Sequence, residues 1–322
     1  PPSTRRRGAG MAKVRANGIT IEVEETGDPA DPPILLIMGL NAQLTVWPEG
    51  FCRGLADRGH RVVRFDNRDV GLSSWLDDHP PVDPIEALFI VLGGGTVEAP
   101  YSLADMADDA VGVLDALGLG SAHVVGASLG GMIGQHVVTR HPDRVRTFTS
   151  IMSMPRFIPM EIDVAMSLQP QDVDPTDREA IVAAGVEAAR LITGTGFPFD
   201  EAYVRREALA NLDRAWHPDG GVRQVVAALA DGDRRPALGT VTVPTLVVHG
   251  TDDPLVLPQG GQETADAIPD AELVWIEGMG HELPEGAWPQ ILDPICALIA
   301  RVEAARTGHG QEPAVPPRTV AG

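Results

Sequence analysis

The sequence predicts an α/β protein in which a mostly parallel central sheet is flanked by helices and carries an inserted helical cap. Short apolar runs typical of strands alternate with helical patterns along most of the 322 residues, as they do in sheets covered on both faces. This alternation breaks once, between about residues 155 and 235, where only helical patterns remain. Both ends of the chain are rich in Pro, Gly, Arg and small residues, which is typical of disordered tails.

The expected strands are recognised by two kinds of apolar pattern. Residues 19–25 alternate apolar and polar side chains, as a half-exposed strand does. Residues 34–38 form a continuous apolar run, which is typical of a buried parallel strand. Similar runs predict five further strands, at residues 61–65, 123–125, 145–152, 245–249 and 272–276.

Helices are expected between these strands. The pattern of residues 102–117 is the clearest, with Ser102 as N-cap, Asp105 at the third helical position and Gly118 as the stop. Residues 129–140 form a second helical pattern, which ends at His141 and Pro142.

The domain boundaries follow from this reading. Residues 13–153 and 237–305 are expected to form the core, and residues 154–236 the helical cap, with helices near residues 178–191 and 202–212. A smaller insertion spans residues 77–101. Residues 1–12 and 306–322 are the expected disordered tails.

Charge and composition limit the partners. The net charge of −20 repels nucleic acid and anionic membrane surfaces, so neither is expected as a partner. No apolar run reaches about 18 residues, so no membrane span is expected. The basic N-terminus lacks the apolar run of a secretory signal, which favours a cytoplasmic protein unless processing has removed a signal. Cys52 and Cys296 are too few for a disulfide framework and lie in no metal-ligand spacing; no metal or cofactor is expected, and no oligomeric state is indicated.

The central motif is Gly126-Ala127-Ser128-Leu129-Gly130, which an apolar strand enters and a helical pattern leaves. This context is that of a nucleophile elbow, a strained turn that lifts a serine hydroxyl clear of the sheet. Flanking glycines are needed because a Cβ would clash within the tight turn. The sequence therefore predicts Ser128 as a nucleophile.

A serine nucleophile needs a base, and the base needs an orienting acid, which follow in the chain order serine, acid, histidine. Two later strands run into loops that supply them, and we expect Asp253 as the acid and His281 as the base. Asp252 is the alternative acid, and Pro254 favours Asp253 because it stiffens the backbone just beyond it. His249 is the alternative base, but it precedes Asp253 and breaks the chain order.

An oxyanion hole needs two backbone N–H donors. The amide of Leu129, directly after the nucleophile, is expected to supply one. The second is expected from Leu40, in the loop after the strand at residues 34–38, where Gly39 lets the chain pass close to substrate.

In these segments the chain resembles the α/β-hydrolase superfamily, from about residue 18 to residue 304. Within it the chain is most similar to the actinobacterial esterase and lipase branch that includes aclacinomycin methylesterase. The resemblance implies Ser128, Asp253 and His281 as the triad and the Leu40 and Leu129 amides as the oxyanion hole. The wider superfamily often has a histidine where this chain has Met38; the donor is a backbone amide, so the hole should persist. The matching segments are residues 37–41, 64–73, 126–130, 191–200, 250–254 and 278–281.

The function hypothesis is ester hydrolysis through an acyl-enzyme, on a small or medium apolar ester. A serine nucleophile argues against haloalkane dehalogenase and epoxide hydrolase chemistry, whereas perhydrolase, haloperoxidase and C–C hydrolase activities use the same triad and stay open. A ligand-binding or signalling protein with a vestigial pocket is the alternative from another class. Substrate-pocket residues are expected at Gly39, Met152, Met154, Phe157 and Ile158, with Met160 beside them.

Residues 66–73 contain three charged side chains directly after a strand. Two interpretations are open: a second acid–base site, or a turn tied together by contacts between aspartate and arginine. The second is favoured, and the family resemblance agrees with it.

Overall fold

The structure, a computed structural model, describes residues 10–79, 82–159, 173–174 and 176–308. Its centre is an eight-stranded sheet with the order β1-β2-β4-β3-β5-β6-β7-β8. The strands are β1 (Gly10–Ala16), β2 (Ile19–Thr26), β3 (Pro33–Ile37), β4 (Arg61–Phe65), β5 (Ala122–Ala127), β6 (Val145–Ile151), β7 (Thr245–Gly250) and β8 (Glu272–Ile276).

Strands β4, β3 and β5 to β8 are parallel to one another, and β2 pairs antiparallel with both of its neighbours, β1 and β4. The carboxyl ends of β3, β5, β7 and β8 therefore meet at one edge of the sheet. Open α/β sheets place their sites at this edge. All seven predicted strands are present, with ends that differ by a few residues.

The N-terminal boundary of the core was predicted wrongly. Residues 10–12 belong to strand β1, which pairs along β2 from Gly10 opposite Glu25 to Ala16 opposite Ile19. Asn17 and Gly18 join the two strands and both have positive φ, 45° and 81°, as a two-residue hairpin turn requires. This Asn-Gly pair is the sequence signal that predicts the hairpin. Residues 1–9 lie outside the described part.

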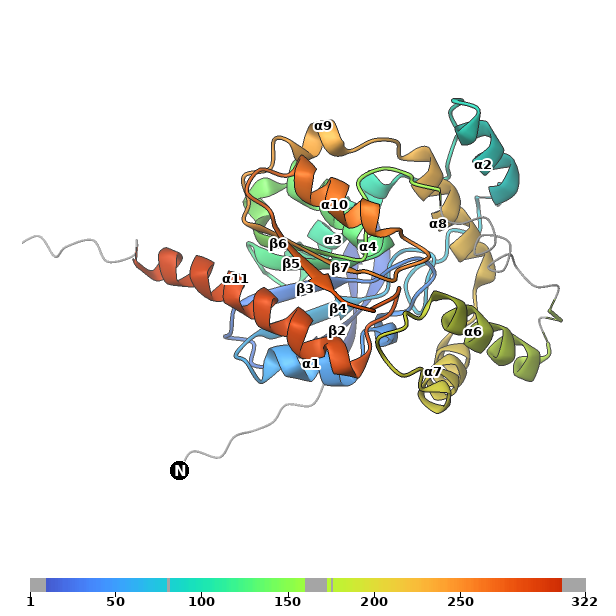
Figure 1. Cartoon of the computed structure of the whole chain (residues 1–322), viewed down its shortest axis with the longest axis horizontal. Coiled ribbons are helices and arrows are strands. Elements are labelled where there is room, and N and C mark those ends of the chain that lie inside the picture. The colour runs from blue at the N-terminus through green and yellow to red at the C-terminus, as the bar shows by residue number, and fades with distance from the viewer. Residues whose placement is uncertain (1–9, 80–81, 160–172, 175, 309–322) are drawn as a thin grey trace, which may run out of the picture.

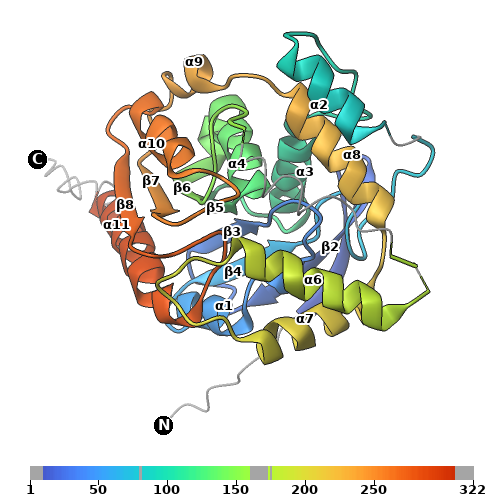
Figure 2. The same cartoon turned by 45° about the vertical axis from the view of Figure 1, so that its right-hand side comes forward.

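Helices cover both faces of the sheet (Figures 1 and 2). On one face α1 and α11 enclose an apolar cluster with β3 and β7, and on the other α3 and α4 enclose a second cluster with β3 and β5. Helix α3 begins at the predicted cap, because the Ser102 hydroxyl accepts from the Asp105 N–H at 3.1 Å and the Asp105 carboxylate accepts from the Ser102 N–H at 2.8 Å. The helices that cover the sheet are α1 (Glu49–Ala56), α3 (Leu103–Ala116), α4 (Leu129–Arg140), α10 (Pro258–Ala267) and α11 (Trp288–Gly308).

Helix α11 continues to Gly308, so the predicted C-terminal tail begins too early by three residues. Residues 309–322 lie outside the described part. None of the helices in the described ranges is long and apolar enough to cross a membrane.

Only helices and loops connect β6 to β7 within the described residues. Helices α6, α7 and α8 lie beyond the carboxyl edge of the sheet, whereas α9 lies beside α10 (Figure 2). We propose residues 154–236 as the extent of this cap. Helix α2 (Pro84–Leu92), from the smaller insertion, packs against α8. The connecting helices are α6 (Arg178–Ile192), α7 (Glu201–Arg214), α8 (Pro218–Ala230) and α9 (Arg235–Leu238).

Candidate active site

Ser128 lies in the sharp turn between β5 and α4, with φ 55° and ψ −123°. This backbone conformation is costly for any residue with a Cβ and persists only where the surroundings impose it. The surroundings are very tight, because a Cβ on Gly126 would lie 2.1 Å from the Gly130 carbonyl oxygen and a Cβ on Gly130 would lie 2.0 Å from the Ile37 carbonyl oxygen. The two glycines thus allow the turn that exposes the serine.

The structure brings Ser128, His281 and Asp253 together from three different loops. The Nε2 atom of His281 lies 3.0 Å from the Ser128 hydroxyl oxygen, and its Nδ1 lies 2.7 Å from Asp253 Oδ2. Asp253 is fixed in turn by its other oxygen, which accepts from the backbone N–H groups of Leu255 and Val256 at 2.9 and 2.8 Å. This arrangement can move a proton from the serine to a histidine whose orientation the aspartate sets.

Asp253 is buried, and its pKa reflects two opposed effects. Burial raises this pKa, but the positive charge of His281 and hydrogen bonds from His249 and His281 outweigh it and lower the pKa from 3.8 to about 2. Asp253 therefore stays ionised at neutral pH. Because its pKa is lowered in the folded state, this carboxylate stabilises the fold above pH 3.8, and the contribution is lost as the pH falls toward 2.

The two alternative residues have other partners. Asp252 accepts hydrogen bonds from the backbone N–H and hydroxyl of Thr195 in the cap. His249 is fully buried, and its Nε2 lies 2.8 Å from the Val256 carbonyl oxygen and 3.5 Å from Asp253 Oδ2. Neither residue contacts Ser128 in the described contacts, so the geometry favours Asp253 and His281.

The two expected oxyanion donors belong to segments that lie beside Ser128. Gly39, in the β3 loop (residues 38–41), is so close that a Cβ there would lie 3.1 Å from the Ser128 Cβ. Leu129 is the first residue of α4, where the N–H has no partner inside the helix. Within the described residues, neither the Leu40 nor the Leu129 N–H finds an acceptor. Two unused donors next to a nucleophile are what an oxyanion hole requires.

A cap segment with no role predicted from the sequence holds the loop that carries His281. This strap (residues 192–196) accepts a hydrogen bond from the His281 N–H at its Ile192 carbonyl, at 2.7 Å, and its Gly196 N–H donates to the Gly278 carbonyl at 2.8 Å. The Gly194 N–H donates to the Glu282 carboxylate. The sequence signal for this contact is that both segments, the strap and the loop before His281, are rich in glycine. Two backbones can approach this closely only where side chains are absent.

Gly194→Ala should lower kcat about 100-fold, since a displacement of about 1 Å at the catalytic groups can cost that much. A Cβ at this position would lie 2.2 Å from the Gly278 carbonyl oxygen and 2.3 Å from the Gly280 N. The strap would have to move away from the loop that carries His281. Steady-state kinetics on an ester measure the effect. Gly185→Ala, in open space on α6, is the matched control and should leave kcat within about twofold; equal losses in both variants would contradict the positioning by the strap.

The predicted pocket residues do not share one cluster. Gly39 lies beside Ser128, as described above. Met152 packs with the cluster under α1 and α11, Met154 with the cluster under α3 and α4, and Phe157 with α2 and α8. Ile158 is buried, and Met160 lies outside the described residues. That these side chains line a substrate pocket stays a prediction.

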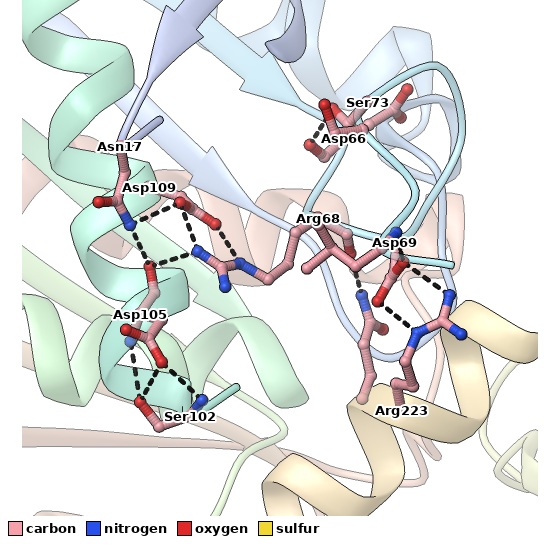
Figure 3. Close-up of polar contacts among 12 residues, drawn as sticks. Asn17, Asp66, Arg68, Asp69, Ser73, Ser102, Asp105, Asp109 and Arg223 are labelled. Carbon is pink, nitrogen blue, oxygen red and sulfur yellow. Dashed lines mark hydrogen bonds and ion pairs between the residues drawn. The ribbon is translucent and has the colours of Figure 1, made fainter. Parts of the chain in front are cut away.

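The charged residues of the β4 loop (residues 66–73) are all paired. Asp66 lies 2.7 Å from an Arg214 nitrogen, Arg68 lies 2.6 Å from an Asp109 oxygen, and Asp69 lies 2.8 Å from an Arg223 nitrogen. Figure 3 shows Arg68 and Asp69 extending from the loop in different directions, toward Asp109 and Arg223. The expected aspartate–arginine contacts are present, but each joins the loop to another element rather than closing the turn on itself: Arg68 pairs with Asp109 on α3, and the two aspartates pair with Arg214 and Arg223 in the cap.

Asp69→Asn should lower the free energy of unfolding by about 3 kcal/mol, because it leaves the buried Arg223 guanidinium with only the mostly exposed Asp77 carboxylate, at 3.2 Å, as a counter-charge. The Asp69 and Arg223 side chains are almost completely buried, 0% and 1% exposed. Urea unfolding followed by circular dichroism measures the loss. The control is Asp213→Asn, which breaks a mostly exposed pair with Arg178 and should cost less than about 1 kcal/mol. Similar losses in the two variants would mean that burial of the pair adds nothing.

The chain belongs to the family described as alpha/beta hydrolase fold, whose sequence profile matches residues 32–286. Two particular relatives are the rhodomycin D methylesterases DauP of Streptomyces sp. (strain C5) and DnrP of Streptomyces peucetius. Each is 33% identical to this chain, over 303 and 306 residues, and each match covers 87% of this chain and 94% of the relative. The predicted family and the similarity to actinobacterial methylesterases are thus confirmed.

Solved structures agree on the fold. A hydrolase from Pseudomonas aeruginosa PA01 superposes with a TM-score of 0.64 and 23% identity, covering 92% of this chain and 98% of the other. At this identity the likeness supports the fold alone.

Within the described residues, no group of three or more His, Cys, Asp or Glu side chains could hold a metal ion.

Proposed function

We propose that this protein is a carboxylic-ester hydrolase that acts through Ser128, His281 and Asp253 and an acyl-enzyme intermediate. The observation that carries the proposal is the continuous contact from the Ser128 hydroxyl through His281 to the ionised Asp253, beside two unused backbone donors. A protein that only binds a ligand has no need for this relay. The two methylesterase relatives support ester hydrolysis as the activity.

The mechanism follows from the contacts. Ser128 Oγ attacks the ester carbonyl while its proton passes to His281 Nε2, and the oxyanion accepts hydrogen bonds from the Leu40 and Leu129 amides. His281 then gives the proton to the leaving alcohol, and the acyl group stays on Ser128. A water molecule, activated by the same histidine, releases the acid. Asp253 stays ionised throughout and holds His281 in the productive orientation.

The relatives' names indicate which esters to test first. Both are named methylesterases, so we propose a methyl ester of an apolar acid as the substrate class. Turnover is measured as methanol release from a series of methyl esters, beside p-nitrophenyl esters of increasing acyl length. Absence of enzyme-dependent hydrolysis across both series would overturn the proposal.

The nucleophile is tested separately by labelling. A fluorophosphonate should react with one residue, and mass spectrometry of the digested protein should find the adduct on the peptide that contains Ser128. An adduct on another serine, with Ser128 unmodified, would overturn this assignment even if ester hydrolysis is observed.

A further inference from the structure

The β3 loop that carries the proposed oxyanion donor is held by two buried amide side chains. On one side of Leu40, Asn67 Nδ2 donates to the Met38 carbonyl oxygen at 2.8 Å. On the other side, the Asn41 N–H donates to Gln224 Oε1 at 2.8 Å. Leu40 therefore lies between two fixed peptide groups.

Only one of these two amides comes from the core. Asn67 belongs to the β4 loop, whereas Gln224 lies on helix α8 between β6 and β7. Gln224 is fully buried, and its other end is also satisfied, because Nε2 donates to the Arg68 carbonyl oxygen at 2.9 Å. Gln224 thus links the cap helix, the β3 loop and the β4 loop.

Helix α8 also packs directly against the same loop. A Cβ on Gly221, one turn before Gln224, would lie 2.7 Å from Asn41 Cγ. Asn41 itself has a positive φ of 52°, a conformation that a non-glycine residue keeps only when its surroundings hold it. The Ala42 N–H closes the turn on the Gly39 carbonyl oxygen at 3.4 Å, and Gly221 and Gln224 hold Asn41 from the side of α8. The conformation of the loop that ends in Asn41 therefore depends on how α8 is docked.

We propose that Gln224 is a positioning residue for the oxyanion hole: through Asn41 it fixes the Leu40 N–H and couples transition-state stabilisation to the docking of the cap. This inference rests on the proposed function. Gln224 does not act on the substrate itself; it holds the peptide that does. A donor must lie within a few tenths of an ångström of the developing charge to be effective, so loosening this loop lowers the rate without closing the site.

Gln224→Met removes both hydrogen bonds with little change in volume, and Gln224→Ala removes the side chain. We expect kcat for a p-nitrophenyl ester to fall about 10- to 100-fold, somewhat less than for removal of an oxyanion donor, with KM within about twofold. The affinity of a trifluoromethyl ketone, whose adduct with Ser128 carries an oxyanion, should fall by the same factor. A structural role alone would leave that affinity unchanged.

Gln135→Ala is the matched control. Gln135 is also a fully buried glutamine, and it bonds Arg234 and the Met154 carbonyl rather than the β3 loop. Its loss should lower stability while kcat and trifluoromethyl ketone affinity change by less than about threefold. Equal effects in the Gln135 and Gln224 variants would overturn the inference.

Hydrogen exchange tests the geometry independently of catalysis. The Asn41 amide should be protected in the wild-type protein and exchange at least about tenfold faster in Gln224→Met, since it loses its acceptor. Unchanged Asn41 protection overturns the inference whatever the kinetics show. The proposed function fails separately, if the wild-type protein and Ser128→Ala hydrolyse esters equally slowly.

Discussion

Ser128→Ala should lower kcat for ester hydrolysis about 10⁶-fold, a loss of roughly 8 kcal/mol of transition-state stabilisation. The variant keeps the fold, because the hydroxyl makes no contact that holds the elbow and Ser128 caps α4 without a side-chain hydrogen bond. What disappears is the atom that receives the acyl group. KM should change little, since binding of the ester does not require the nucleophile.

Ser153→Ala provides the control for this loss. Ser153 is buried near the elbow, but its hydroxyl donates to the Ser128 carbonyl oxygen at 2.8 Å and does not reach His281. Its removal should cost about 1 kcal/mol of stability and leave kcat within about threefold. The comparison is made by steady-state kinetics, with the residual rate of Ser128→Ala corrected for spontaneous hydrolysis. Residual activity near the wild-type level would identify another nucleophile.

The sequence predicts those parts of the site in which local signals agree. Around Ser128 the apolar strand, the two glycines and the helical pattern all require one conformation, and the structure has it. The seven strands found from apolar runs or alternation are buried or half-buried in the sheet, where the pattern of side chains decides the secondary structure. Strand β1 was missed because its residues alternate weakly and its pairing depends on the Asn17-Gly18 turn.

The contacts that join the cap to the catalytic loops could not be predicted in this way. The strap at residue 192 reaches the loop at residue 281, and Gln224 reaches Asn41. Neither contact has a periodicity or spacing that marks it in one sequence. Each contact forms only because the fold packs together segments that lie far apart in the chain. In the sequence, Gln224 cannot be distinguished from any other polar residue on a helix.

The choice between Asp252 and Asp253 shows the same limit on a smaller scale. The two residues are adjacent and chemically identical, so sequence favours one of them only through Pro254. The structure separates them by direction: Asp253 is buried against His281, and Asp252 bonds Thr195 in the cap. This difference predicts that substitution of Asp253 abolishes most of the activity, whereas the same substitution of Asp252 has little effect.

Asp253→Asn should lower kcat about 10⁴-fold. An asparagine can keep an oxygen for the backbone N–H groups of Leu255 and Val256, which now donate to Asp253 Oδ1. Its amide nitrogen would then donate to His281 Nδ1. The imidazole would have to adopt the tautomer in which Nδ1 is the unprotonated acceptor. The Nε2 atom would carry the proton and could no longer take one from Ser128. The lost carboxylate would also no longer stabilise the protonated histidine.

Asp252→Asn is the matched variant and should leave kcat within about threefold. Its side chain lies outside the relay, and an asparagine oxygen can still accept from Thr195. Steady-state kinetics of both variants on one ester, with circular dichroism to confirm folding, give the comparison. A large loss in Asp252→Asn with an active Asp253→Asn would assign the acid to Asp252. That result would require the loop after β7 to rotate during catalysis, because Asp253 is the carboxylate that contacts His281 here.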